Sequence, residues 1–176
     1  VRQIVGGEPL PLVDGLSAED CESGRQWNWD GVNFQLWQWA SAHDSNSRSC
    51  VLQIEAGGER LLLTGDIEGA AERALLDSPL AVSTDWLQSP HHGSRTSSSM
   101  ALLNRLQPKS VLISRGNGNS FGHPHPTVMA RYRKSGLNIY DSADQGAVHL
   151  QLGRFKPPVT MRQERRFWRD PPPLPK

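Results

Sequence analysis

The chain has 176 residues, which is room for one domain of ordinary size or for part of a larger one. Its 19 Lys and Arg nearly balance 18 Asp and Glu, so no bulk cationic field points to nucleic acid, and any such contact must come from local charge. Two cysteines are too few for a disulfide scaffold or a CxxC metal knuckle. We interpret Cys21 and Cys50 as packing residues and leave a single bridge between them open.

The start of the chain carries no targeting or spanning signal. No apolar run approaches the roughly 20 residues that cross a bilayer, and no basic-then-apolar signal peptide is present. The chain also begins without Met and enters a strand-like segment at once. We therefore expect a soluble chain that further sequence precedes.

Turn residues and hydrophobic period predict two hairpins in the first part of the chain. Residues 1–26 are rich in Gly, Pro, Asp and Ser, which indicates loops apart from the strand-like segment 2–5. Bulky residues alternate around an Asp-Gly turn in 27–40, and a Gly-Gly turn joins two strands in 49–66. We interpret the tryptophans of these strands as sheet packing rather than a base-stacking platform.

Helical and strand patterns alternate after residue 66. Helices are predicted over 67–78, 98–107 and 125–136, and strands over 84–90, 110–116, 137–142 and 146–152. This order predicts a mixed α/β domain over residues 1–155. Residues 156–176 are rich in Pro and Arg and lack a period, so we expect a tail that is at best docked by Phe167 and Trp168.

Asp66 is the first candidate for chemistry. It follows a leucine-rich strand and a glycine, so rigid backbone would hold its carboxylate at a cleft. Asp is also among the best N-cap residues, and the helix predicted after it would suit that role. Both interpretations stay open on the residues alone.

The segment SPHHGS supplies the second candidate cluster. Successive strand side chains point to opposite faces, so one of His91 and His92 should face the cleft and the other the loop. Ser94 and the hydroxyls after it offer donors near a helix start, where anions are favoured. The competing interpretation is a pair of surface histidines.

The third cluster is GNGNSFGHPHP, an irregular loop after a buried strand, where ligands commonly sit in α/β sheets. His123 and His125 are restrained by the proline between them. An HxH spacing is a weak metal signal alone, but three clusters that each follow a strand make a joint signal. His43 and His149 lie in a polar loop and a strand, where a structural role fits better.

Four segments in this order resemble the C-terminal half of the metallo-β-lactamase-like domain of ComEC-type DNA-internalisation competence proteins. They are NSRSCVLQIEAGGERLLLTGDIE, LQSPHHGSRTSSS, LISRGNGNSFGHPHP and GLNIYDSADQGAVHLQLG, and the likeness runs roughly from Trp27 to the end. The resemblance implies an αβ/βα sandwich, present as its C-terminal half only: a mixed sheet with flanking helices. Strand-end loops of that fold hold metals at one edge.

The resemblance also implies roles for individual residues. Asp66 takes the position of the bridging acidic ligand of a divalent metal, zinc or manganese, and His92, or else His91, takes the late histidine position. His123 or His125 would contact a phosphate or move a proton. Arg95, Arg115 and the backbone around Ser94 are candidates for steadying the charge of the reacting phosphate.

The departures from the family pattern limit that expectation. The signature HxDxDH or HxHxDH is missing, and Trp39 or its neighbours stand where the superfamily has a further histidine, unless His43 substitutes. A catalytic zinc keeps about three protein ligands plus a water, and a two-metal site needs more. We therefore expect an incomplete site, and an isolated chain that binds metal weakly and does not turn over.

The resemblance implies a functional setting. The chain would be the C-terminal part of a hydrolase domain, a phosphodiesterase or nuclease acting on the DNA strand that is not transported. Its partners would be single-stranded DNA, the remainder of an inner-membrane ComEC-type protein, and a second copy meeting the exposed sheet face. Alternatives are a non-catalytic nucleic-acid-binding or scaffolding module of a DNA channel, or a phosphoesterase of this fold with another substrate. Metal identity, membrane side and strand polarity stay open.

Overall fold

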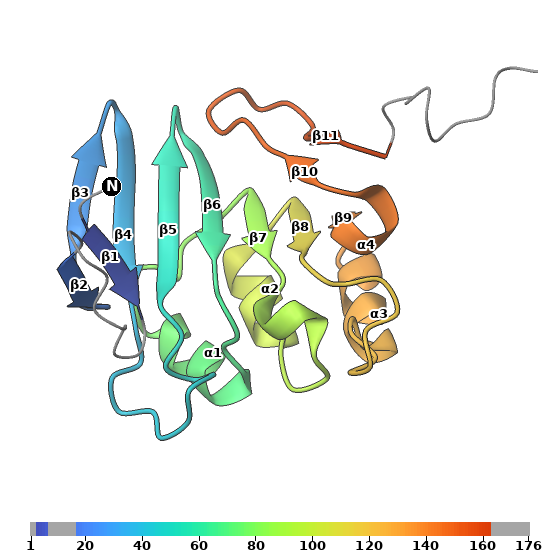
Figure 1. Cartoon of the computed structure of the whole chain (residues 1–176), viewed down its shortest axis with the longest axis horizontal. Helices are drawn as coiled ribbons and strands as arrows, with labels where there is room; N and C mark the ends of the chain where they lie inside the picture. Colours follow the sequence, from blue (N-terminus) through green and yellow to red (C-terminus); the bar gives the residue numbers. More distant parts are fainter. Residues whose placement is uncertain (1–2, 7–16, 163–176) are drawn as a thin grey trace, which may run out of the picture.

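The computed structural model describes residues 3–6 and 17–162, and Figure 1 shows the arrangement of their helices and strands. One mixed sheet has seven strands in chain order: β3 (Gln26–Trp29), β4 (Val32–Trp37), β5 (Val51–Ala56), β6 (Glu59–Leu63), β7 (Trp86–Gln88), β8 (Ser110–Ile113) and β9 (Asn138–Asp141). The helices are α1 (Gly69–Leu76), α2 (Met100–Leu106), α3 (Pro126–Lys134) and α4 (Ser142–Gln145), with a 3-10 turn η1 (Pro90–Gly93). Two further pairs are β1 (Gln3–Gly6) with β2 (Ser17–Asp20), and β10 (Val148–His149) with β11 (Val159–Thr160).

Strands β3 to β6 form the antiparallel part of the sheet, as the two predicted hairpins require. Asp30 and Gly31 join β3 to β4 with φ of 49° and 81°, and Gly57 and Gly58 join β5 to β6 with φ of 55° and 82°. Two consecutive residues at positive φ are what a tight hairpin turn needs to match the twist of its strands. Both turn predictions are confirmed.

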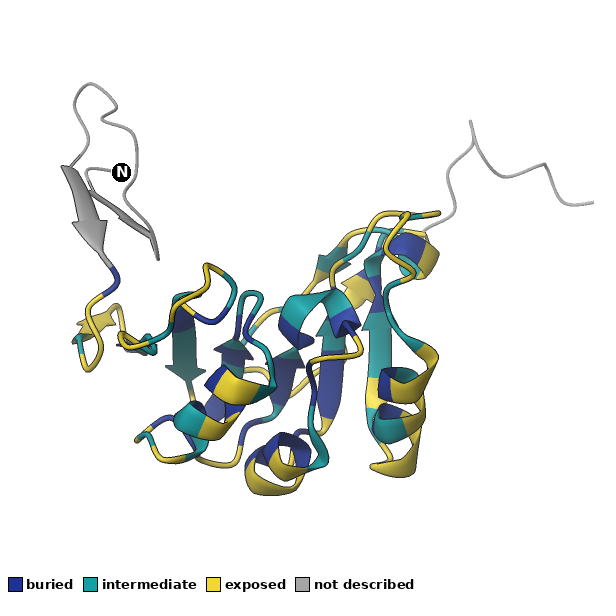
Figure 2. Ribbon diagram, turned by 90° about the horizontal axis from the view of Figure 1, so that it is seen from below, coloured by how far each residue is buried: buried dark blue, intermediate teal, exposed yellow. Residues whose placement is uncertain are grey.

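Strands β6 to β9 are parallel, and a helix connects each to the next. Right-handed crossovers place α1, α2 and α3 on one face of the sheet (Figure 2). Cross-strand neighbours Leu62, Leu87 and Val111 point to that face and are fully buried. The core therefore lies between the sheet and one layer of helices, and the carboxyl ends of β6, β7 and β8 lie along one edge (Figure 1).

None of α1, α2 and α3 covers the opposite face of the sheet (Figure 2). The strand register places Leu52, Ile54 and Leu61 on that face, and all three side chains are partly exposed. Trp27, two strands away on the same face, is 38% exposed. One sheet with helices on a single face confirms the α/β class and the mixed sheet with flanking helices.

Other details differ from the sequence-based expectation. β2 lies in a segment predicted as loop, and the strand expected over 146–152 shrinks to β10, which pairs with β11 beyond residue 155. Two-residue strands among prolines leave no period to detect. The division between domain and tail stays a prediction, and Phe167 and Trp168 lie outside the described residues.

Cys21 and Cys50 form a disulfide, with Cα atoms 5.8 Å apart. The expectation that they are packing residues is wrong, and the alternative left open, a single bridge, is what the structure has. The bond ties the segment after β2 to the start of β5. None of the helices in residues 3–6 and 17–162 has the length and apolar character needed to cross a membrane.

Candidate metal site

Three loops meet at the edge formed by the carboxyl ends of β6, β7 and β8. They are residues 64–68, here the acidic loop; residues 89–99, the histidine loop; and residues 114–125, the third loop. The sequence candidates Asp66, His91, His92 and His123 all lie on them. Parallel neighbouring strands explain this convergence, because their carboxyl ends lie at the same edge of the sheet.

The acidic loop depends on Gly65, which has a φ of 57°. A Cβ there would lie 2.9 Å from Ser49 Cβ, and Asp66 N donates to Ser49 Oγ at 3.0 Å. Glu68 is the residue at the N-cap of α1, and its side chain makes no capping bond. The interpretation of Asp66 as a helix cap is therefore wrong, and its carboxylate is left to face the edge of the sheet.

Both histidines of the histidine loop face the acidic loop. His91 Nδ1 lies 3.0 Å from Glu68 Oε1, and His92 Nε2 lies 3.5 Å from Asp66 Oδ1. The prediction that one histidine faces the cleft and the other the loop is wrong. It assumed strand alternation, but His91 and His92 have φ of 45° and 54° within η1, so the strand rule does not apply.

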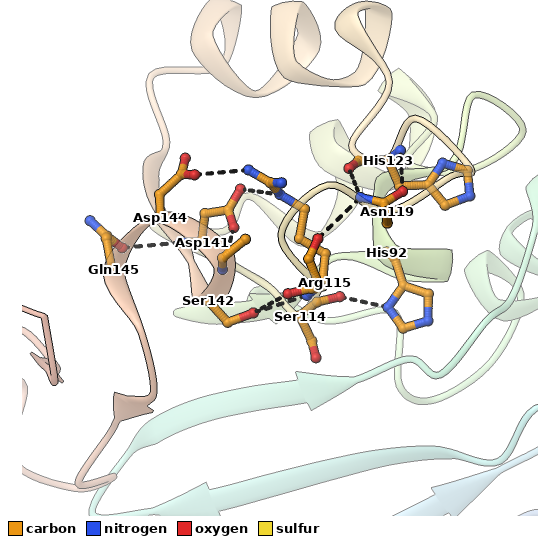
Figure 3. Close-up of polar contacts among 11 residues, drawn as sticks. His92, Ser114, Arg115, Asn119, His123, Asp141, Ser142, Asp144 and Gln145 are labelled. Atoms are coloured by element: carbon orange, nitrogen blue, oxygen red, sulfur yellow. Dashed lines mark hydrogen bonds and ion pairs between the residues drawn. The ribbon is translucent and has the colours of Figure 1, made fainter.

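His92 is oriented from its other ring nitrogen. Nδ1 lies 2.6 Å from the carbonyl oxygen of Ser114, at the end of β8, as Figure 3 shows. A carbonyl can only accept, so Nδ1 carries a proton, and Nε2 is the ring nitrogen that faces Asp66. Metal-binding histidines are commonly fixed by such a contact to the nitrogen that does not bind.

His123 joins the two histidines from the third loop. Asn119 holds it, because Asn119 Oδ1 accepts from His123 N at 3.0 Å and Asn119 Nδ2 donates to His123 O at 2.7 Å (Figure 3). The ring centroids of His91 and His123 are 5.6 Å apart. Burial, then the neighbouring His91 and His92, lower the pKa of His123, which keeps its ring neutral near pH 7.

Two ring nitrogens of this cluster are buried without a hydrogen bond: Nδ1 of His91 and Nδ1 of His123. His91 Nδ1 lies 3.0 Å from Glu68 Oε1, but the two atoms are not aligned for a hydrogen bond. Buried polar atoms are usually paired, so unpaired imidazole nitrogens beside carboxylates suit a bound cation.

The other predicted residues have structural partners. His125 Nδ1 accepts from Thr127 N at 3.2 Å and so caps α3, and Ser94 Oγ lies 3.0 Å from Thr96 Oγ1 with Ser94 only 7% exposed. Each of these side chains therefore has a partner within its own segment.

Arg115 does not suit the role of steadying a phosphate. Its Nε pairs with Asp141 Oδ2 at 2.7 Å and its Nη2 with Asp144 Oδ1 at 3.0 Å (Figure 3). Two carboxylates already satisfy its charge, so that expectation is corrected. Arg95 is exposed on the histidine loop and stays a candidate.

Sequence reasoning missed Glu68, the partner of His91. The signal was its position two residues after Asp66 in GDIEG, which brings a second carboxylate to the same turn. Together the loops supply two carboxylate–imidazole pairs with nitrogen and oxygen donors that suit zinc or manganese. Among the described residues, no three His, Cys, Asp or Glu side chains form a ready set around one ion.

Comparisons with known proteins show which family the chain belongs to. The family model "Metallo-beta-lactamase superfamily" matches residues 23–116, which include Asp66, His91 and His92. Competence protein ComA of Neisseria gonorrhoeae is 36% identical over 154 residues, covering 86% of this chain and 22% of the relative. Recombination protein 2 of Haemophilus influenzae is 35% identical over 137 residues, covering 75% of this chain and 17% of the relative.

ComE operon protein 3 of Bacillus subtilis is 32% identical over 106 residues, 60% of this chain and 14% of the relative. The chain thus spans only a minor part of these relatives. A solved putative zinc-dependent hydrolase from Thermotoga maritima has a TM-score of 0.41 and 12% identity, covering 68% of this chain and 62% of that one. The predicted resemblance is confirmed: the relatives include a competence protein and a ComE operon protein, and the chain belongs to the metallo-beta-lactamase superfamily.

Proposed function

We propose that this chain is the C-terminal part of a metal-dependent phosphodiesterase domain in a DNA-uptake protein, and that it acts on the strand that is not transported. The observation that carries the proposal is the pair of facing contacts at one sheet edge, Asp66 with His92 and Glu68 with His91. The names of the relatives, which include competence and recombination proteins, support a role with DNA.

The metal would be held by Asp66 and His92, with His91 as a further ligand. The features that fit it are Nε2 of His92, which faces Asp66, and Nδ1 of His91, which is buried without a hydrogen bond. A bound divalent ion would polarise a phosphate ester and activate water. Because few ligands of this chain converge, we propose that the chain alone binds metal weakly and does not turn over.

The remaining residues would bind and orient the ester. His123, whose backbone is held by Asn119, would donate to a phosphate oxygen or accept a proton at its unpaired ring nitrogen. His125 stands next to it at the start of α3, and Arg95 on the histidine loop supplies an exposed cation. The backbone around Ser94 would add donors.

A second candidate function is a non-catalytic nucleic-acid-binding or scaffolding module. The observation that favours it is the exposed cationic end of α3, where Arg133 and Lys134 are free of the core. Such contacts would weaken steeply as salt rises. A phosphoesterase of the same fold with another substrate is the third alternative, since one fold hosts many substrates.

The Cys21–Cys50 disulfide supports a location outside the cytosol. Disulfides persist in oxidising compartments and are rare in the cytosol. We therefore place this domain on the outer side of the inner membrane, attached to the remainder of a membrane-embedded ComEC-type protein. A second copy meeting the partly exposed sheet face is the further partner we propose.

Metal titration and a nuclease assay test the proposal. We expect weak zinc or manganese binding by the pure chain and no cleavage of labelled single-stranded DNA; robust cleavage by the pure chain would overturn the claim of an incomplete site. In the full-length parent protein, Asp66→Asn should lower cleavage by about a hundredfold or more, since losing even an outer-shell partner of a metal site costs up to that much.

Asp77→Asn is the matched control, because Asp77 is an exposed carboxylate at the other end of α1. It should leave cleavage unchanged. Full activity of the parent protein after Asp66→Asn would contradict the metal role. A parent protein that binds DNA without cleaving it in any divalent metal would favour the scaffolding module.

A further inference from the structure

The histidine loop has an unfavourable backbone. His91, His92 and Ser98 have φ of 45°, 54° and 57°, although none of them is glycine. Residues with a Cβ keep such conformations only when surrounding contacts impose them. The position of the two imidazoles therefore depends on whatever holds the two ends of the loop.

Tyr132 of α3 joins those two ends. Its side chain is fully buried, and its hydroxyl lies 2.7 Å from Ser89 Oγ and 2.6 Å from Ser98 Oγ. Burial raises the pKa of Tyr132 to about 12, so the hydroxyl stays protonated and can donate one bond while accepting the other. One atom thus fixes the distance between residues nine apart in the chain.

Glu72 of α1 holds the same end of the loop from the opposite side. Its carboxylate is fully buried and accepts hydrogen bonds from Ser98 N and, at 2.9 Å, from Ser99 N. Burying a carboxylate is costly unless its oxygens are satisfied, and an apolar residue would often serve stability as well. A requirement to hold these two amides explains why a carboxylate stands there.

Further hydrogen bonds from the same helices hold the loop. Gly69 N, at the start of α1, donates to Thr96 O at 3.0 Å, and Arg131 Nη1 of α3 donates to Ser97 O at 2.9 Å. Ser97 Oγ also donates to Pro90 O at 2.7 Å, inside the loop. The loop is therefore held between α1 and α3, which lie on the same face of the sheet (Figure 2).

We propose that Glu72 and Tyr132 are positioning residues, which hold the histidine loop so that His91 faces Glu68 and His92 faces Asp66. Both side chains act through the loop backbone and hydroxyls that they bind, those of Ser89, Ser98 and Ser99. The inference rests on the proposed metal function for its purpose, but the placement of the rings can be measured without metal.

The variants Glu72→Gln and Tyr132→Phe test the proposal, because each keeps the size of the side chain. Glu59→Gln is the matched control: Glu59 is 1% exposed and its carboxylate also accepts from backbone amides, those of residues 153–155, away from the histidine loop. For each protein, thermal unfolding, the NMR signals of the imidazole nitrogens without metal, and zinc affinity by calorimetry are measured.

We expect all three variants to lose thermal stability. Only Glu72→Gln and Tyr132→Phe should shift the ring signals of His91 and His92 and weaken zinc binding, by about tenfold or more, as for other outer-shell partners. Glu59→Gln should leave the ring signals unchanged. If Glu72→Gln does not fold, the milder Tyr132→Phe decides.

Unchanged His91 and His92 signals in a folded Glu72→Gln or Tyr132→Phe variant would overturn the inference. So would equal shifts in Glu59→Gln, because the effect would then be general loosening. A wild-type chain that binds no zinc would contradict the proposed metal function instead, and the metal-free ring signals would still decide the positioning role.

Discussion

At the scale of single residues, two loops of the site can pack together because Gly93 has no side chain. Gly93 has a φ of 81°, and its carbonyl accepts from His125 N at 2.8 Å. A Cβ there would lie 2.7 Å from Pro124 Cβ. The histidine loop and the third loop therefore dock only because residue 93 has no side chain.

Gly93→Ala should accordingly lower the free energy of unfolding by about 2 kcal/mol or more, since strained φ alone costs about 1–3 kcal/mol and the contact with Pro124 adds to it. Urea denaturation measures the loss. Gly118→Ala is the control, because Gly118 also has a positive φ, 65°, but no atom would lie within 4 Å of a Cβ at this position. Equal losses in the two variants would show that the docking contact with Pro124 contributes nothing.

Arg115 illustrates how burial changes the contribution of an ion pair to stability. Its side chain is 16% exposed and that of Asp141 is 8% exposed. Removing one partner of a buried pair leaves the other charge uncompensated, which costs about 3 kcal/mol or more. Arg115→Met should therefore destabilise the chain by about that amount in chemical denaturation.

Lys109→Met provides the comparison for Arg115. Lys109 pairs with Asp85 at the same distance of 2.7 Å, but its side chain is 71% exposed. Solvent screens such a pair, so the loss should be much smaller. If both substitutions cost the same, burial is not what makes the Arg115 pair matter.

At the scale of elements, the parallel strands position the loops of the candidate site, and the antiparallel strands form an extended surface. The three loops of the site follow β6, β7 and β8, and each leads into a helix on the same face. The hairpins of β3 to β6 instead reach beyond that helical layer. Their attachment includes one covalent tie, the bond between Cys21 and Cys50.

Reducing that disulfide should lower the free energy of unfolding by about 3.6 kcal/mol, the chain-entropy value for a loop of this length. The two cysteines are 29 residues apart. Denaturation with and without reductant measures the loss, and a Cys21→Ser, Cys50→Ser double variant serves as control. A reductant effect that persists in the double variant would not come from this bond.

At the scale of the whole molecule, the sheet has one buried face and one partly exposed apolar face. Large exposed apolar surfaces mark interaction sites or cause association. Ile54 and Leu61 are cross-strand neighbours on that face, and β3 to β6 carry further apolar side chains beside them. A single layer of helices therefore cannot complete this domain's core on both sides.

We expect the chain to self-associate as its concentration rises, which sedimentation velocity can measure. Ile54→Lys should shift the association equilibrium toward the monomer, because a charge on this face opposes apolar contact. Asn28→Lys is the control, since Asn28 is exposed on the other face of β3. Equal effects of the two lysines would indicate that net charge, not this face, governs association.

Local pattern determined much of this protein. Alternation, the Asp-Gly and Gly-Gly turns and the helical period located most elements of the sheet and its helices, because these depend on hydrogen bonds and φ preferences between near neighbours. The positions of Asp66, His91, His92 and His123 at strand ends followed from the same reasoning. Their convergence followed from the rule that parallel strands share an edge.

Tertiary structure alone decided how those side chains are used. The left-handed turn that directs both His91 and His92 to the acidic loop, the pairing of Arg115 with Asp141, and the bond between Cys21 and Cys50 all join segments that are distant in sequence. Each depends on the distance and direction between atoms after the chain has packed. Such contacts leave no period in the sequence. The hydrogen bonds of Glu72 and Tyr132 to the histidine loop are therefore evident only in the folded structure.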